Sequence, residues 1–280
     1  MSAHFPNEDS TRVAASRLVL VDLDDPASSR FLAFDDLEDA DRAIISPDQT
    51  TIFFEGKSRL RGLVDVATGE ITKPTYIDFA GVAPAVPMWH PDSEELVFGV
   101  SGGFVPATDL YGYDVTKDSL YFIVEGVFEL APLALLGADS LLVYGASWNQ
   151  QTQTALSMLS LHTGDLLREI PHLYLDTSQS GWIHYNPSAD RLTVRSADSS
   201  LVVTDLDATF VRRMKTPPGV VHDSAKALTK DVIMFTHRRG VRDYLSSDVR
   251  IWNHRTGTVR PLLAPEQLHQ AVGVSYACYY

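Results

Sequence analysis

The sequence predicts an all-β fold, a six-bladed β-propeller of four-stranded antiparallel blades whose last blade is closed by both chain termini. Three observations predict it. Short β-branched and aromatic runs alternate with turn residues along the whole chain. No long window carries helical periodicity, and strand-like alternation dominates. Two hairpin motifs also recur in alternation, at a spacing typical of propeller blades.

The first hairpin motif places proline and a small polar residue between two apolar runs. It stands at Ser46-Pro47-Asp48-Gln49, at His90-Pro91-Asp92-Ser93 and at Asn186-Pro187-Ser188-Ala189, with degenerate copies at 136–140 and 228–231. Proline fixes φ near the value that a type I turn needs and keeps the preceding residue extended. Asp or Ser then accepts hydrogen bonds from free turn amides, so each copy predicts a hairpin.

The second motif, represented by Asp65-Val66-Ala67-Thr68-Gly69, predicts a hairpin with Gly, Asp or Asn at its apex, where positive φ is needed. Its polar position recurs at residues 22, 65, 114, 160, 205 and 253, at intervals of 43, 49, 46, 45 and 48 residues. A repeat of about 46 residues is the length of a four-stranded blade.

Five copies of the first hairpin precede a copy of the second, which leaves one unmatched hairpin at the N-terminus and one apolar strand at the C-terminus. Because an open sheet edge invites aggregation, we expect these two pieces to complete one blade. The prediction is a single domain over residues 1–280. Its complete blades are expected at 40–77, 84–125, 128–171, 180–216 and 224–263, and its composite blade at 12–36 plus 271–280.

Composition restricts the classes of partner and compartment. The formal net charge of −13 repels phosphate backbones and anionic membranes, so we expect no general nucleic-acid binding. Cys278 is the only cysteine, which excludes an internal disulfide framework. Neither a secretory signal nor a membrane-spanning stretch is visible, since the most apolar run, 130–144, is broken by Pro132, Gly137 and Asp139. A cytoplasmic location without membrane insertion is the expectation.

The run from Trp89 to Phe98, W-H-P-D-S-E-E-L-V-F, resembles the W-S-P-D-G-x-x-[LI]-x-F repeat of TolB-like propellers. The same repeat is found in the propeller domains of prolyl-oligopeptidase-type peptidases and in oligogalacturonate lyases. The apex 65–69 is similar to the D-x-x-T-G hairpin of WD40 and related repeats. This resemblance to the TolB-like and WD40-like superfamily, with its PD40-type repeats, covers nearly the whole chain and implies a propeller without indicating a specific member.

Four long loops are expected to join the second and third strands of their blades, at 55–61, 101–109, 146–154 and 236–248. Long loops on a rigid scaffold are common recognition sites. Two of them are basic within an acidic protein, which suggests an anion-binding rim; the alternative is a pair of solvated loops. The candidate rim residues are Lys57, Arg59, Arg61, Arg238, Arg239, Arg242 and Tyr244.

The loop at 146–154 couples an aromatic side chain, Trp148, to amide side chains that begin with Asn149. Such a loop suits stacking on a sugar ring or anchoring a protein partner. The alternative is a tryptophan that folds back over the edge of its blade. By contrast, Trp89, Trp182 and Trp252 occupy repeat positions or strands, where packing between blades is expected.

Three histidines, His172, His222 and His269, fall in connections between successive blades. Equivalent positions could converge on the axis, where three imidazoles would suit Zn²⁺ or Mn²⁺. The tripeptide 267–269 is similar to part of the histidine-rich metal site of oligogalacturonate lyases. The alternative is three independent loop histidines.

No nucleophile turn, phosphate-binding loop or triad spacing is evident, so no catalytic residue is assigned. The expected function is therefore a non-enzymatic binding or scaffold module that recognises a protein or glycan partner, anionic partners included, through its loop-rich face, with no cofactor. The alternative is a metal-dependent lyase or hydrolase acting on an acidic carbohydrate, with one divalent metal. A structural role within an oligomer is a third option.

Overall fold

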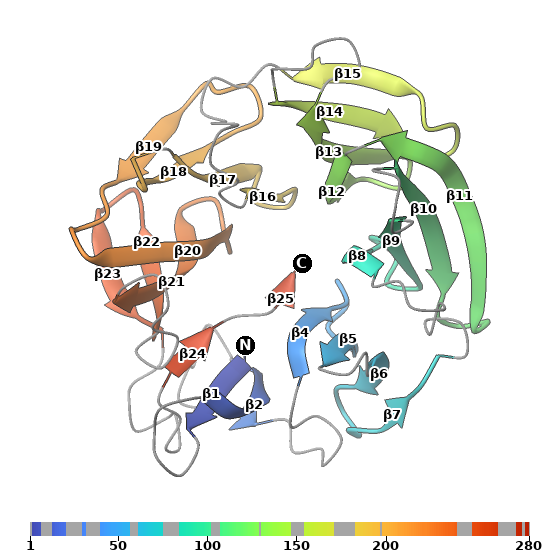
Figure 1. Ribbon diagram of the computed structural model, residues 1–280, viewed down its shortest axis with the longest axis horizontal. Coiled ribbons are helices and arrows are strands. Elements are labelled where there is room, and N and C mark those ends of the chain that lie inside the picture. The colour runs from blue at the N-terminus through green and yellow to red at the C-terminus, as the bar shows by residue number, and fades with distance from the viewer. Residues whose placement is uncertain are drawn as a thin grey trace.

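The structure is a computed structural model of the 280-residue chain. The residues that it describes are 2–6, 13–20, 30–31, 40–56, 61–74, 84–101, 107–128, 130–146, 154–170, 183–196, 198–239, 248–262, 273–275 and 278–279. All regular elements among them are β-strands, arranged as a ring around a central axis (Figure 1). None of the described residues form a helix long and apolar enough to cross a membrane.

Five blades are each built from one contiguous stretch, with the first strand innermost (Figure 1). Blade 1 contains β4 (Ala40–Ile45), β5 (Thr51–Gly56), β6 (Arg61–Asp65) and β7 (Ile71–Thr72). Blade 2 contains β8 (Pro84–Trp89), β9 (Glu95–Ser101), β10 (Ala107–Asp114) and β11 (Ser119–Phe128). Blade 3 contains β12 (Leu130–Leu136), β13 (Ser140–Ala146), β14 (Thr154–Ser160) and β15 (Leu166–Ile170). Blade 4 contains β16 (Ile183–Asn186), β17 (Arg191–Arg195), β18 (Leu201–Thr204) and β19 (Val211–Met214). Blade 5 contains β20 (Val220–Ala227), β21 (Val232–Arg239), β22 (Asp248–Asn253) and β23 (Thr258–Pro261).

The two chain ends form a further sheet, here called the terminal sheet, which lies between blade 5 and blade 1 (Figure 1). Its strand order is β24-β1-β2-β3, and its strands are β1 (Ser2–Pro6), β2 (Val13–Leu20), β3 (Arg30–Phe31) and β24 (Gly273–Ser275). The last strand, β25 (Cys278–Tyr279), does not belong to the terminal sheet. It pairs in parallel with β4, Cys278 opposite Ala43 and Tyr279 opposite Ile44.

The predicted ring of six uniform four-stranded antiparallel blades, closed by 12–36 and 271–280, is therefore wrong. The molecule is a five-bladed propeller, and β25 makes the sheet of blade 1 five-stranded. Two features explain the error. Strand β1 lies before the predicted composite blade, and the single C-terminal strand is divided between two sheets. The spacing of the repeat shows how many hairpins the chain contains, but it does not show with which strand an isolated strand pairs.

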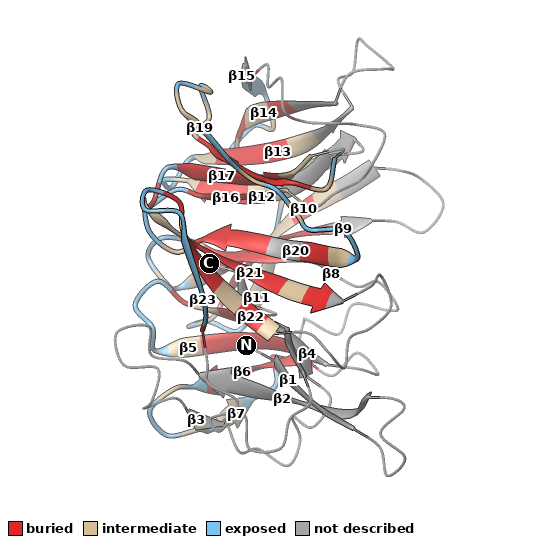
Figure 2. Cartoon of the chain, turned by 90° about the vertical axis from the view of Figure 1, so that its left-hand side faces the viewer, coloured by how far each residue is buried: buried red, intermediate tan, exposed pale blue. Residues whose placement is uncertain are grey.

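The apolar core lies between the blades. One cluster joins Ile44 and Phe53 of blade 1 to Trp89 and Phe98 of blade 2, and similar clusters fill the interfaces between blades 2 and 3, 3 and 4, and 4 and 5. Figure 2 shows buried residues concentrated in the strands, with exposed residues at the turns. Trp89 and Trp252 are buried in these interfaces, which confirms their predicted packing role; Trp182 lies outside the described residues.

Candidate functional site

The described residues include only part of the predicted site. Outside them lie Lys57, Arg59, Trp148, Asn149, Arg242, Tyr244, His172 and His269. Arg239 is the last residue of β21, and the structure describes its backbone but not its side chain. The structure therefore shows the side chains of Arg61, Arg238 and His222 alone among the predicted site residues.

Arg61 is the first residue of β6, directly opposite Glu55 on β5. Its Nη2 and Nε both donate to Glu55 Oε1, at 3.0 and 3.2 Å. The side chain of Arg61 is only 4% exposed, so the pair is largely removed from solvent. Removing either partner would leave an uncompensated buried charge, so each of the two side chains requires the other. Arg238 is also buried, within β21.

His222 is buried on β20, where it takes part in a chain of hydrogen bonds that sequence reasoning does not reveal. Thr216 Oγ1 donates to the carbonyl of Ser199 at 2.5 Å. Since that hydroxyl has one proton, the 3.2 Å contact between His222 Nδ1 and Thr216 Oγ1 makes Nδ1–H the donor. In the neutral ring, Nε2 of His222 then accepts from Nδ1–H of His237, 3.1 Å away on the adjacent strand.

Both ring nitrogens of His222 are engaged in this arrangement. A metal ion needs a free nitrogen lone pair. Binding a metal through His222 would therefore require its bond with His237 or with Thr216 to break. Within the described ranges, no group of three or more His, Cys, Asp or Glu residues is placed to hold a metal ion.

A second buried polar group, which the sequence analysis missed, lies where β16 and β20 meet. His184 of β16 and Lys226 of β20 are both buried, as is Thr193 of β17. Burial, reinforced by the positive charge of Lys226, holds the pKa of His184 well below its ordinary value. The Nδ1 atom of His184 is buried without a hydrogen-bond partner. The alternation Ile183-His184-Tyr185 is typical of a strand with one solvated face, so no sequence signal indicated that His184 is buried.

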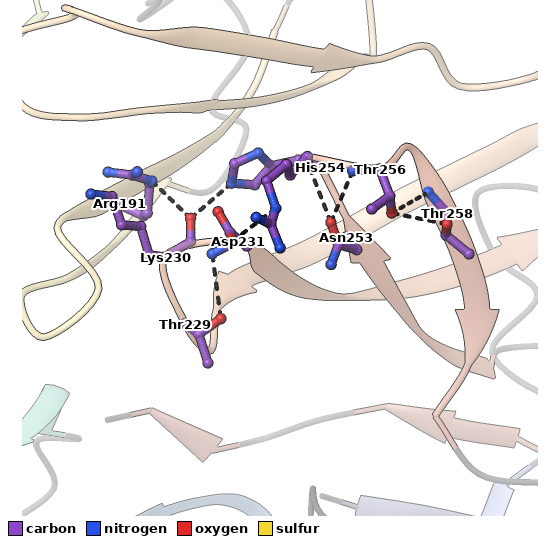
Figure 3. Close-up of polar contacts among 9 residues, drawn as sticks. Arg191, Thr229, Lys230, Asp231, Asn253, His254, Thr256 and Thr258 are labelled. Carbon is purple, nitrogen blue, oxygen red and sulfur yellow. Dashed lines mark hydrogen bonds and ion pairs between the residues drawn. The ribbon is translucent and has the colours of Figure 1, made fainter.

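Polar groups also tie the turns of blades 4 and 5 together (Figure 3). The carbonyl of Lys230 accepts from Arg191 Nε of blade 4 at 3.1 Å, and Nε2 of His254 approaches the same oxygen at 2.8 Å. The guanidinium of Arg191 also lies over the ring of Phe210, 4.4 Å from its centroid. The bond from Arg191 to Lys230 joins one blade to the next, and the other two contacts hold its partners in place within their own blades.

Comparison with known proteins places the fold. No family model and no curated protein matches the sequence. Among solved structures, a putative TolB from Agrobacterium tumefaciens aligns with a TM-score of 0.64 at 14% identity, over 89% of this chain and 88% of that one. TolB from Acinetobacter baumannii aligns with a TM-score of 0.64 at 13% identity, over 92% of this chain and 64% of that protein, just under two thirds of its length.

Oligogalacturonate lyases share the architecture as well. The enzyme from Vibrio parahaemolyticus aligns with a TM-score of 0.55 at 12% identity, over 93% of this chain and 78% of that one. A second oligogalacturonate lyase, solved in complex with manganese, aligns with a TM-score of 0.53 at 14% identity, over 89% and 72% of the two chains. At these identities the likeness concerns the fold. The chain therefore has a β-propeller fold like that of the TolB structures.

Proposed function

We propose that this chain is a non-enzymatic binding propeller that recognises a protein or glycan partner through the loop-rich face of its ring. The observation that carries the proposal is that the candidate side chains which the structure describes are engaged in hydrogen bonds within the protein. Arg61 bonds to Glu55, and His222 bonds to Thr216 and His237. These side chains hold strands and blades in place, as in a scaffold.

The strand order supports a common face for the predicted loops. The segments 57–60, 102–106, 147–153 and 240–247 each follow the second strand of a blade and precede the third. Equivalent strands of successive blades run in the same direction around a propeller, so these four connections begin at the same end of their blades. Recognition through loops on such a scaffold is common.

The test compares variants of the loops with a variant of the outer wall. Trp148→Ala and the double change Lys57→Glu with Arg59→Glu should each reduce binding on an array of neutral and uronate-containing glycans, or reduce quantitative recovery of protein partners. Arg260→Glu on the exposed strand β23 is the matched control and should behave as wild type. Unchanged binding in both loop variants would refute the proposed face.

A metal-dependent lyase or hydrolase of acidic carbohydrates is the second candidate function. One observation favours it: His222 and His237 lie opposite each other on β20 and β21, with Nε2 and Nδ1 3.1 Å apart, so a metal that replaced their hydrogen bond would find two nitrogen ligands together. Under this candidate, protein purified without a chelating resin should contain Zn or Mn at near-stoichiometric level by elemental analysis. The metal should then be lost in His222→Gln, and its absence from wild-type protein would count against the candidate.

A further inference from the structure

The outermost strand of blade 2 differs from the outermost strands of the other blades. β11 has 10 residues, whereas β7, β15, β19 and β23 have 2, 5, 4 and 4. The three strands β15, β19 and β23 each contain arginine, and β23 ends in proline. The stretch S-L-Y-F-I-V at 119–124 of β11 contains neither charge nor proline. Proteins usually protect exposed edges by short length, charge or proline, and this stretch carries none of these features.

The outer edge of β11 has no neighbour among the strands that the structure describes. The strand order of blade 2 is β11-β10-β9-β8, which places β11 at the end of its sheet and at the rim of the ring (Figure 1). Residues Ser119–Phe122 pair in regular register with Tyr111–Asp114, and the register shifts only beyond Phe122. The first part of β11 is therefore a regular edge on which another strand could pair.

Two exposed aromatic side chains flank this edge. Phe122 is 52% exposed and meets Tyr111 edge to face, with ring centroids 5.5 Å apart. On the other side of the sheet, Tyr121 is 39% exposed, and its hydroxyl donates to Glu95 Oε2 at 2.7 Å. Successive residues of a strand point to opposite faces, so an added strand would meet one aromatic ring on each face.

The turns beside this edge are acidic. Together with the adjoining ends of β9 and β10 they carry five carboxylates and one ammonium group: Asp92, Glu94, Glu95, Asp114, Asp118 and Lys117. Hydrogen bonds from Lys117 and Thr116 lower the pKa of Asp114 to about 2, so this carboxylate stays charged at neutral pH. Burial, followed by the hydrogen bond to Glu95 and the charges of Glu95, Asp114 and Asp92, raises the pKa of Tyr121. The local potential is therefore negative.

We propose that β11 is a docking edge for a partner protein, which adds an extended segment of alternating basic and apolar residues as a further strand beside Ser119–Phe122. Main-chain hydrogen bonds would supply affinity, and the aromatic pair with the acidic turns would select the sequence. A second copy of this chain, with its own net charge of −13, suits the acidic edge less well than a basic segment does. This surface lies on the outer wall and is independent of the proposed loop-rich face.

The experiment uses the full chain and a synthetic peptide, acetyl-Lys-Val-Thr-Val-Arg-Val-Thr-Val-Lys-amide, with fluorescence anisotropy and hydrogen–deuterium exchange. Binding should slow exchange in the proteolytic fragment that contains residues 119–128. Phe122→Lys should weaken binding by about tenfold, or about 1.4 kcal/mol, because an aromatic cross-strand contact is lost and the added charge repels the basic peptide. Glu94→Lys, at an exposed turn position, should also weaken it. Leu167→Lys on β15, which is 53% exposed in the wild type, is the matched control and should bind normally.

Three outcomes would overturn the proposal. The first is an absence of protection at 119–128. The second is equal binding of the peptide in which glutamate replaces each lysine and arginine. The third is concentration-dependent dimerisation of the free protein that Phe122→Lys abolishes, because a second copy would then occupy the edge. Circular dichroism of each variant distinguishes a lost contact from a lost fold.

Discussion

At the scale of single residues, two turns of this propeller have a non-glycine residue at the position where the P-D-G repeat of TolB-like propellers has glycine. Gln49 and Ser93 follow the Pro-Asp pair of their turns, and both have positive φ, 63° and 67°. Their backbone geometry matches the glycine of the P-D-G repeat, so the motif could be recognised although its glycine was missing. An L-residue in this region is strained by about 1–2 kcal/mol.

This strain predicts that Gln49→Gly stabilises the protein. Relief of the strain exceeds the extra chain entropy that glycine adds to the unfolded state, which is about 0.5–1 kcal/mol. The free energy of unfolding, measured in urea, should rise by roughly 0.5 kcal/mol. The control is Glu70→Gly, an exposed turn residue without positive φ, which should lower it. Equal effects of the two substitutions would refute the explanation.

His184 predicts a defined pH dependence. Because burial lowers its pKa in the folded state, the unfolded chain binds more protons below the ordinary pKa of histidine, about 6.5. The free energy of unfolding should therefore fall as the pH drops from 7.5 to 5.5, and His184 should account for about 1 kcal/mol of this fall. The variant His184→Leu should remove that part of the decline.

The readout for His184 is the urea midpoint of unfolding at each pH. The control Leu167→Ala changes an exposed side chain without a titratable group and should keep the wild-type decline. If His184→Leu leaves the slope unchanged, His184 is not the buried neutral group described here. The sequence could not indicate this group, since its environment is created by β20, about 40 residues further along the chain.

At the scale of strands and hairpins, the sequence predicted what is local. The hairpins at 46–51, 90–95, 65–70 and 253–258 form, because proline, aspartate and glycine determine turns within a few residues. Contacts between blades depend on residues about one repeat apart. Trp89 Nε1 donates to the carbonyl of Ile44 at 3.3 Å, and Asn186 Nδ2 donates to the carbonyl of Ala227 at 2.8 Å. The repeat predicted that Trp89 packs between two blades. No sequence pattern predicted the bond of Asn186.

A substitution at Thr193 measures how much such a polar contact between two blades contributes to the free energy of unfolding. It is fully buried, and its Oγ1 lies 2.7 Å from the carbonyl of Ala225 in blade 5 and 3.2 Å from that of His184 in its own blade. Thr193→Val keeps the shape and leaves these carbonyls without the hydroxyl donor. The free energy of unfolding should fall by about 1–3 kcal/mol. Thr72→Val, at an exposed position of β7, should change it little, and comparable losses in the two variants would contradict this role.

At the scale of the whole molecule, the repeat predicted a ring and misjudged its closure. Five contiguous blades follow from the 46-residue spacing, because each blade buries its faces against its neighbours. The pairing of the chain ends depends on contacts between residues more than 200 positions apart, which no local pattern encodes. The candidate site was predicted as a set of loops, and in the described part of it Arg61 bonds to Glu55 and His222 bonds to Thr216.

The closure of the ring by β25 on β4 can be tested with the one native cysteine. Cys278 lies opposite Ala43 in this parallel pair, and neighbouring strands lie about 4.8 Å apart, within reach of a disulfide. We expect Ala43→Cys to form an intramolecular disulfide under mild oxidation. The bond closes a loop of more than 200 residues, so it should raise the melting temperature markedly. Ala227→Cys on β20 is the control for non-specific oxidation and should retain both thiols.

The decisive measurement is the number of free thiols in oxidised, monomeric Ala43→Cys protein, determined by alkylation and mass spectrometry under denaturing conditions. The structure predicts none, together with a higher melting temperature that reduction reverses. Two free thiols in Ala43→Cys, or equal cross-linking in Ala227→Cys, would contradict closure of the propeller by its C-terminal strand on blade 1.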